Sequence, residues 1–491
     1  MTFAKHIKQL VTESLIYGIL GMLSKPRVIN TILLPFYTRI FTPYDYGIMN
    51  LLLAFLGFFM MLVVAGLDSS SAVWFYDTKN QEDQKSTFSC WFWCQSVISL
   101  FFGVGIIFFS SWLSEVLFDT TKYKWLIQIL AFILFFATAN RVLTSWFLFQ
   151  RRAWGTSIVS LMTSFGVAIL SIILVYFLNM RLLGVFWAQL IGTLMTTIAT
   201  VWIMKDWLSL KYFSWLRLKK MLAFGLPLAP ASVASWIIMF SDSFILKYFY
   251  DSTEIGLYAV AFNIAGLVGI FTAGFQMAWS PFAYSIQKEE VSGHVYAKVL
   301  SLYGWAGCFF CTACSLFASF ILKVLATPEY SSAASAVPFL AFSFLLLGIR
   351  DIASIGPAFV KKSVPVALSI FIAAGLNIIL NLILVPLMGK DGAAFASMVS
   401  YLISAVYLFW IAQKHFYIPY EFKPVLVCFC FSWIIIAINM FFIPLDSFWG
   451  FVFRVVLCSL FLPLAFYLKV LTHEHVRKLI QKIHLQHLIK I

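Results

Sequence analysis

The sequence predicts an all-α membrane protein with about fourteen transmembrane helices, arranged as two six-helix lobes and a further C-terminal helix pair. Of its 491 residues, 62% are hydrophobic and only 11% are charged. The mean hydropathy is +0.93, which is typical of integral membrane proteins. The apolar runs have the length of a spanning helix, whereas the strands of a membrane β-barrel are shorter and alternate in hydropathy. An internal repeat then divides these helices into lobes.

The individual spans follow the apolar runs of the chain. The first run lacks a short hydrophobic region followed by a small-residue cleavage site, so we expect no cleavable signal peptide. The loops between the runs are short, and no soluble domain is expected in them. The predicted spans are 14–39, 46–67, 90–110, 125–147, 154–178, 183–204, 221–248, 255–281, 298–322, 336–359, 363–386, 392–413, 424–443 and 448–468.

The formal net charge of +14 is a topology signal in a chain of this hydropathy, and it does not indicate a nucleic-acid partner. When the spans alternate in direction, most Lys and Arg residues fall on the side that holds both termini. Both termini are therefore expected in the cytoplasm. The eight Cys residues all lie in apolar runs, where they are expected to be buried packing residues and to form neither disulfides nor a metal site.

The two halves of the sequence align at an offset close to 209 residues. Asp45-Tyr46-Gly47 aligns with Glu254-Ile255-Gly256, and Gly166 falls near Gly375 in two similar apolar runs. Six spans per repeat give both halves the same orientation, so the repeat is parallel, as in transporters that rock two lobes around a cavity. The predicted divisions are an N-terminal lobe at 1–204, a cytoplasmic interfacial linker at 205–220, a C-terminal lobe at 221–415, an extra helix pair at 416–468 and a basic cytoplasmic tail at 469–491.

Four cations are predicted to lie at membrane depth. Lys25 and Arg27 flank a proline in the middle of the first apolar run, and Arg141 and Arg350 occupy equivalent positions of the two repeats. A charge at this depth is costly and usually faces a polar cavity or a partner. The guanidinium fork suits phosphate, so this interpretation predicts a binding site for an anionic substrate that carries phosphate.

A structural interpretation of the same arginines stays open, in which each neutralises a buried acid. Asp68 and Asp242 are acids within spans, and Asp351 is adjacent to Arg350. Adjacent side chains of a helix point apart, so we do not expect Asp351 to pair with Arg350. Arg454 lies within snorkelling distance of the outer membrane edge, so we interpret it as a structural residue.

Asp242 in the seventh span is the candidate ion-coupling residue, for a proton or a sodium ion. It could equally pair with a cation or cap the backbone at a helix distortion. Amide side chains inside a span either line a cavity or join helices by hydrogen bonds, and the second use is commoner. The amides inside the predicted spans are Asn140, Asn263, Gln276, Asn377 and Asn381. No catalytic motif is present, so we expect no enzyme activity, no metal and no cofactor beyond the coupling ion.

Three stretches of the sequence resemble a known family. They are the run LSKPRVINTILLPFYTRIFTPYDYGIMNLLLAF at 23–55, the run SDSFIL at 241–246 that follows GLPL at 225–228, and the run QMAWSPF at 276–282. These stretches resemble the polysaccharide-export branch of the MOP (multidrug/oligosaccharidyl-lipid/polysaccharide) superfamily, which includes the Wzx-type O-antigen flippases. The resemblance extends over essentially the whole chain.

This resemblance implies a MATE-like fold in the bacterial inner membrane. The implied activity moves an undecaprenyl-pyrophosphate-linked oligosaccharide, such as the O-antigen unit of lipopolysaccharide, from the cytoplasmic to the periplasmic leaflet by ion-coupled alternating access. Lys25 and Asp242 fall at positions that this family uses, whereas Pro26-Arg27 departs from its usual apolar continuation. The implied partners are the lipid-linked substrate and membrane lipids. Whether a polysaccharide polymerase and a ligase work beside the chain is left open.

Three other functions compete with this interpretation. A MATE-type exporter of organic cations would need acids in the N-terminal lobe, where Asp68 is the acid near a span end. The substrate of a lipid II flippase has the same anionic anchor as a lipid-linked oligosaccharide. Only the three stretches that resemble the polysaccharide-export branch argue against this function. A membrane glycan polymerase or transferase would need acids or histidines on a large loop, and the sequence has no such loop.

Overall fold

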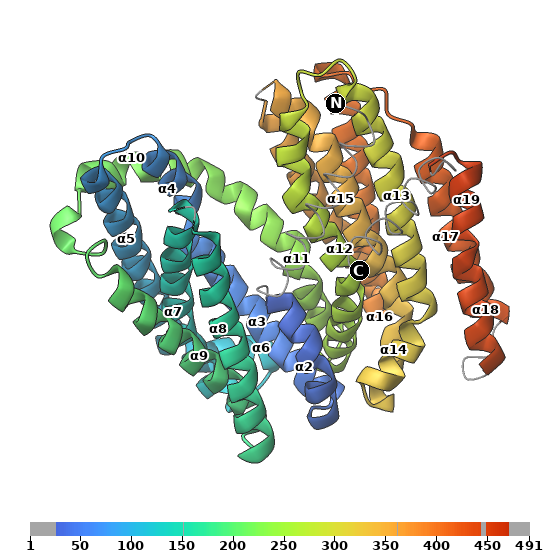
Figure 1. Ribbon diagram of the computed structural model, residues 1–491. Helices are drawn as coiled ribbons and strands as arrows, with labels where there is room; N and C mark the ends of the chain where they lie inside the picture. Colours follow the sequence, from blue (N-terminus) through green and yellow to red (C-terminus); the bar gives the residue numbers. More distant parts are fainter. Residues whose placement is uncertain (1–25, 151, 361, 443–447, 471–491) are drawn as a thin grey trace, which may run out of the picture. The chain divides into compact units, whose positions relative to one another are not determined.

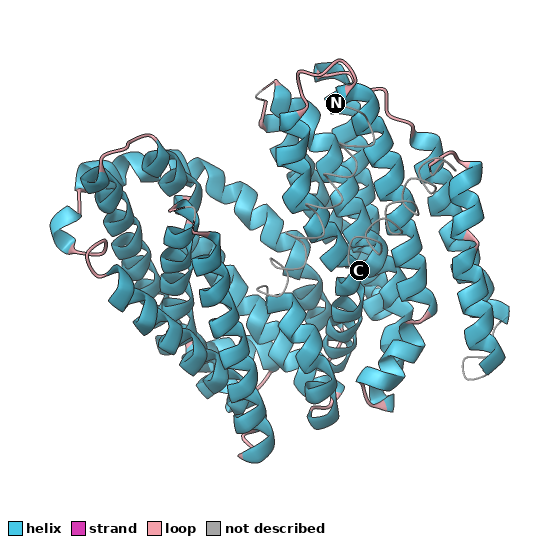
Figure 2. Ribbon diagram, viewed as in Figure 1, coloured by secondary structure: helices cyan, strands magenta, loops and turns pink. Residues whose placement is uncertain are grey.

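A computed structural model describes residues 26–150, 152–360, 362–442 and 448–470. Every regular element in these ranges is helical (Figures 1 and 2). Within these ranges, twelve helices are long and apolar enough to cross a membrane. The predicted all-α membrane fold is therefore confirmed.

The number of spans agrees with about fourteen once two features are considered. The 52-residue helix α16 (Val364–His415) joins two helices across Gly389, whose φ of 55° and ψ of −133° are not helical. Glycine tolerates this backbone conformation, which other residues rarely adopt. The first predicted span is described only from Pro26 onward, as α2 (Pro26–Ile40).

The described chain forms two compact units. The N-terminal unit runs to Val260 and also contains Ala374–Ala393 from the middle of α16. Its helices are α2, α3 (Pro43–Val64), α4 (Leu67–Tyr76), α5 (Gln81–Phe108), α6 (Ser110–Phe118), η1 (Thr121–Tyr123), α7 (Lys124–Phe149), α8 (Ala153–Ile172), η2 (Ile173–Phe177), α9 (Arg181–Met204), η3 (Leu210–Tyr212), α10 (Trp215–Gly225), η4 (Leu226–Leu228), α11 (Ala229–Phe249) and the beginning of α12 (Ser252–Ser285).

The C-terminal unit contains Ala261–Ala373 and the described chain from Ala394 onward. Its elements are the remainder of α12, α13 (Ser292–Leu316), α14 (Ala318–Leu325), η5 (Pro328–Ala336), α15 (Val337–Phe359), both ends of α16, α17 (Phe422–Phe442), α18 (Phe448–Ser459) and α19 (Phe461–Tyr467).

The order of elements repeats between the two halves of the chain. In the first half, the long helix α5 is followed by the short helix α6, the 3₁₀ turn η1 and the long helix α7. In the second half, α13, α14, η5 and α15 follow in the same order. This correspondence agrees with the repeat read from the sequence.

The linker at 205–220 contributes to the core of the N-terminal unit. Leu208 and Leu218 are buried in one cluster with Phe88 and Trp91 of α5 and Trp146 of α7. Burying such large apolar side chains contributes about 2 kcal/mol each, so the linker is held by packing. Its placement at the membrane surface stays a prediction.

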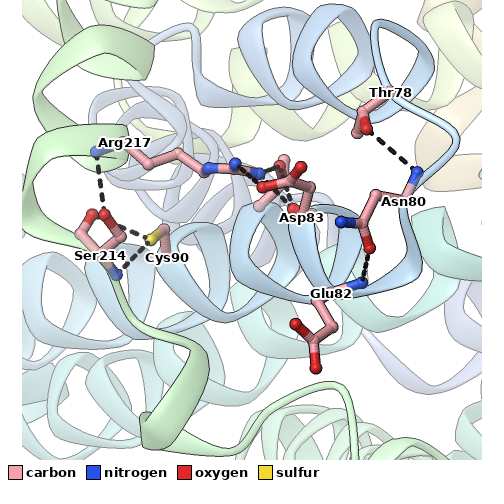
Figure 3. A network of polar contacts seen from close by, with 8 residues as sticks. Thr78, Asn80, Glu82, Asp83, Cys90, Ser214 and Arg217 are labelled. Carbon is pink, nitrogen blue, oxygen red and sulfur yellow. Dashed lines mark hydrogen bonds and ion pairs between the residues drawn. The ribbon is translucent and has the colours of Figure 1, made fainter.

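Polar contacts fix the linker to α5 at the same place (Figure 3). The Arg217 guanidinium binds the carboxylate of Asp83 and donates to Thr87 Oγ1 at 3.1 Å. Ser214 caps α10 by accepting from the backbone N–H of Arg217 at 3.3 Å, and its own N–H donates to Cys90 Sγ at 3.2 Å. The start of α10 is thereby joined to the first turns of α5.

Replacing Arg217 by Ala is expected to lower the stability of the purified protein. The loss is about 1 kcal/mol, because Asp83 is partly exposed and solvent weakens the pair. The measurement is thermal unfolding in detergent. Lys219→Ala, which removes an exposed cation of the same helix, is the control and should leave the midpoint unchanged. Equal midpoints for Arg217→Ala and Lys219→Ala would show that the contact has no stabilising role.

Candidate functional site

The strongest candidate site surrounds Asp242 of α11, whose side chain is buried at 1% exposure. Tyr258 of α12 donates its hydroxyl to one carboxylate oxygen. Asn377 and Asn381 of α16 donate their side-chain N–H groups to the other oxygen, at 3.2 and 2.7 Å. Three helices of the N-terminal unit thus meet at one carboxylate. These three donors fix the position of the carboxylate between the helices.

Several oxygen acceptors lie beside this carboxylate. Ser241 donates its hydroxyl to Asn377 Oδ1 at 2.8 Å. The side-chain oxygen of Asn381 is buried and has no hydrogen-bond partner in the described part of the chain. A buried carbonyl without a partner costs about 1–3 kcal/mol, so a bound cation or proton here would offset a real penalty. Carboxylate and carbonyl oxygens are the ligands that hard cations prefer.

The local sequence explains how this site forms. Asp242 lies seven residues before the end of α11, about 10 Å inside the helix end. Asn377 and Asn381 are one helical turn apart and therefore share a face of α16.

The sequence identified Asp242 as an ion-coupling candidate and both amides as polar span residues. The spacing of the two amides was the signal that could have joined them into one site.

A close helix crossing lies near this carboxylate in the same unit. A Cβ at Gly47 of α3 would overlap the carbonyl oxygen of Ser252, and one at Gly256 of α12 would overlap that of Pro43. Gly47 and Gly256 are the residues that the repeat alignment pairs. The two equivalent helices therefore touch through equivalent glycines, and larger residues do not fit without separating the backbones.

Hydrogen bonds connect this crossing to the Asp242 site. Asn50 of α3 donates to Ser243 Oγ, next to Asp242, at 3.0 Å. Glu254 of α12 accepts from the backbone N–H of Lys390 in α16 at 3.0 Å, beside the Gly389 kink. Helix α12 thus takes part in both the Asp242 site and the crossing, and α3 is joined to the site through Asn50.

Arg141 is paired with an acid of its own unit. Its guanidinium binds the carboxylate of Asp68 in α4, with Nε 2.7 Å from Oδ2. The Arg141 side chain remains 49% exposed. The pairing matches the structural interpretation, and the exposure leaves donors available to a further anion.

Arg350 also has an acidic partner. Its Nη2 lies 3.1 Å from Asp351 Oδ1, and Gln276 donates to the other oxygen of Asp351 at 2.5 Å. The expectation that the adjacent Asp351 would point away was wrong. The arginine side chain is long enough to fold back along the helix, and its group is 12% exposed.

The remaining predicted cations are only partly described. Lys25 lies outside the described residues, and Arg27 is the second residue of α2. Arg141 belongs to the N-terminal unit and Arg350 to the C-terminal unit. A shared cationic cavity for the four residues stays a prediction. Among the residues that the structure describes, no cluster of His, Cys, Asp or Glu could hold a metal ion.

The fold is that of a two-lobed helical membrane transporter. The structure superimposes on the lipid II flippase MurJ in an inward closed conformation with a TM-score of 0.74, over 92% of this chain and 98% of that one, at 17% identity. It superimposes on a multidrug resistance MATE family transporter of the MOP superfamily with a TM-score of 0.66, over 81% and 97% of the two chains, at 16% identity. Similarity at this level of identity shows a shared fold.

Residues 11–287, more than half of the chain, match the model of the family described as polysaccharide biosynthesis protein. The chain belongs to this family, which confirms the predicted membership of the MOP superfamily. A curated relative, an uncharacterized membrane protein of Methanocaldococcus jannaschii, is 24% identical over 217 residues. The match spans 41% of each protein, so the chain covers about two fifths of the length of that relative.

Proposed function

We propose that this protein is a flippase for a lipid-linked oligosaccharide. It moves an undecaprenyl-pyrophosphate-linked repeat unit of a surface polysaccharide, such as O-antigen, from the cytoplasmic to the periplasmic leaflet of a bacterial inner membrane. Its termini lie in the cytoplasm, and it performs transport without catalysis. Membership of a polysaccharide biosynthesis family, in a chain with a transporter fold, supports this substrate class.

We infer that transport is coupled to a proton or a sodium ion at Asp242. The observation that carries this inference is the buried carboxylate held by Tyr258, Asn377 and Asn381. Intramembrane carboxylates of this kind mark ion pathways in transporters. Because α11, α12 and α16 all contact Asp242, the charge state of this group can change how these helices pack. Because α12 also forms the crossing at Gly47 and Gly256, a change in its packing would reach that crossing as well.

The anionic head of the substrate is proposed to bind Arg141 and Arg350, with Lys25 and Arg27 in the same cationic cavity. The side chain of Arg141 is more exposed than that of Arg350. An arginine can bind a carboxylate and a phosphate together, because its guanidinium carries five N–H donors. Asp68 would then orient Arg141 toward the substrate.

Surface polysaccharide in a deletion strain tests this proposal. Complementation by the wild-type gene should restore the polysaccharide, whereas Arg141→Ala and Arg350→Ala should each reduce it about tenfold or more, since a charge-assisted contact is worth about 1.5–3 kcal/mol. Asp68→Asn is the matched variant, because it keeps Arg141 and an oxygen that can orient it but removes the negative charge of its partner, and it should retain most activity.

Other outcomes identify other roles. If Arg141→Ala and Asp68→Asn both lower the amount of folded protein, and the exchange Asp68→Arg with Arg141→Asp restores it, the pair is structural. Full complementation by the double variant of Arg141 and Arg350 would remove both residues from the substrate site. An intact surface polysaccharide in the deletion strain, with increased sensitivity to cationic drugs, would favour a MATE-type exporter.

A lipid II flippase is the second candidate, because the superposition on MurJ covers nearly the whole of both chains. Expression in a strain depleted of its own lipid II flippase separates the two functions. Rescue of growth would favour lipid II. Rescue of surface polysaccharide without rescue of growth would favour the oligosaccharide substrate.

A further inference from the structure

Arg454 is a buried cation in the hairpin of α17 and α18. Its side chain is 2% exposed, and its Nε donates to Asn439 Oδ1 of α17 at 2.8 Å. Both residues belong to the C-terminal unit. The guanidinium is therefore held inside the hairpin by an amide and does not snorkel out of the protein.

The contacts that Arg454 makes with the described residues leave its charge unbalanced. Asn439 is neutral, and Nη2 is buried without any hydrogen-bond acceptor among the described residues. The arginines at 141, 217 and 350, in contrast, each bind a carboxylate. A guanidinium carries five donors and cannot lose its charge, so burying it without a counter-charge is unfavourable. An anion from outside the chain would satisfy both the donors and the charge.

The position of Arg454 indicates where this anion comes from. Arg454 lies six residues after the first residue of α18, a rise of about 9 Å. Side chains of a helix lean toward its N-terminus, and an extended arginine spans about 6 Å, so the guanidinium lies close to that end of the span. Phe448 and Trp449 begin the helix and are 75% and 76% exposed, as in the aromatic belt at a membrane interface. The anions at this level of a bilayer are lipid phosphates.

We propose that Arg454 and Asn439 form a binding site for a lipid-borne phosphate at the end of the α17–α18 hairpin. The guanidinium offers two parallel N–H groups to phosphate oxygens, and Asn439 fixes its orientation through Nε. The phosphate belongs to a membrane phospholipid or to the pyrophosphate of a polyprenyl lipid. This site is independent of the proposed transport function and of the Asp242 site.

The experiment uses the full-length protein in detergent without added lipid. Phosphatidylglycerol is added as the probe, and dioleoylglycerol, which has the same tails without phosphate, is added in parallel. Phosphatidylglycerol should raise the Tm of the wild type by about 2 °C or more, and dioleoylglycerol should not. Undecaprenyl pyrophosphate at equal concentration identifies the source, because the lipid that saturates the shift at the lower concentration is the preferred one.

Two variants decide whether the site is responsible. Arg454→Gln removes the cation, and Asn439→Asp supplies an internal carboxylate that competes with the lipid. Both should lose the shift, and Asn439→Asp should fold at least as stably as the wild type, so it decides the test if Arg454→Gln does not fold. Lys423→Gln, at the other end of α17, is the control and should keep the shift. A full shift in folded Asn439→Asp, or equal shifts with dioleoylglycerol or inorganic phosphate, would overturn the proposal.

Discussion

Replacing Asp242 by Asn is expected to abolish ion-driven transport while the protein remains folded. Asparagine has nearly the shape of aspartate: its one oxygen can accept from Asn377 and Asn381, and its N–H2 group can donate to the Tyr258 hydroxyl oxygen. It can neither titrate nor hold a cation by charge. The gradient-driven rate should fall on the order of 100-fold, the upper range for loss of an ion-coordinating contact. The measurement is flipping of a fluorescent lipid-linked oligosaccharide in proteoliposomes with an imposed proton or sodium gradient.

A second readout separates coupling from simple loss of function. Without a gradient, Asp242→Asn should still equilibrate the substrate between leaflets, because its substrate site is unchanged. Asn381→Ala should show a weaker form of the same defect and need about tenfold more of the coupling ion. Asp77→Asn, at an exposed acid of the same unit, should behave as the wild type. A wild-type response of Asp242→Asn to the gradient would exclude this residue from coupling.

The helices themselves could be predicted because their signal is local. An apolar run of spanning length forms a helix in a membrane whatever its neighbours are, since backbone groups must be satisfied within the segment. The sequence predicts a break between the spans 363–386 and 392–413. In the structure this break is the kink at Gly389 inside α16. The same local reasoning could not show that the linker would be buried through Leu208 and Leu218, because this depends on which helices pack against it.

The candidate site was predicted in part. Asp242 could be recognised because placing an acid inside a membrane span costs free energy, so such residues are rare and usually functional. Its partners Asn377 and Asn381 are 135 and 139 residues away, a separation that only the packed helices resolve. The direction of Cβ alone does not predict the Asp351 partner of Arg350, because an arginine side chain is long enough to fold back along its own helix. The contact between Gly47 and Gly256 was missed although the repeat alignment had already paired the two residues.

The Gly256→Ala variant is expected to produce the second large effect, through the crossing of α3 and α12. The new Cβ would overlap the carbonyl oxygen of Pro43, which is backbone and cannot rotate away. The helices must then separate, at a cost of about 1–3 kcal/mol or more to the crossed state. Gly47→Ala should act in the same way against Ser252, because the contact is reciprocal. Gly266→Ala is the control, since a Cβ at this position of α12 meets nothing within 4 Å.

The consequence for transport depends on whether the crossing has to open. If it is a permanent joint, both variants lose thermal stability and activity together, in proportion. If it opens during each cycle, the added methyl group disfavours the crossed state relative to the open one. A cysteine placed at Asn50, beside the crossing, should then react faster with a membrane-impermeant maleimide in Gly256→Ala than in Gly266→Ala. A shift of about 1.4 kcal/mol would change this labelling rate tenfold, provided that labelling follows the open population. Equal labelling in the two variants, with equal stability, would show that α3 and α12 accommodate the methyl group and that the crossing is no gate.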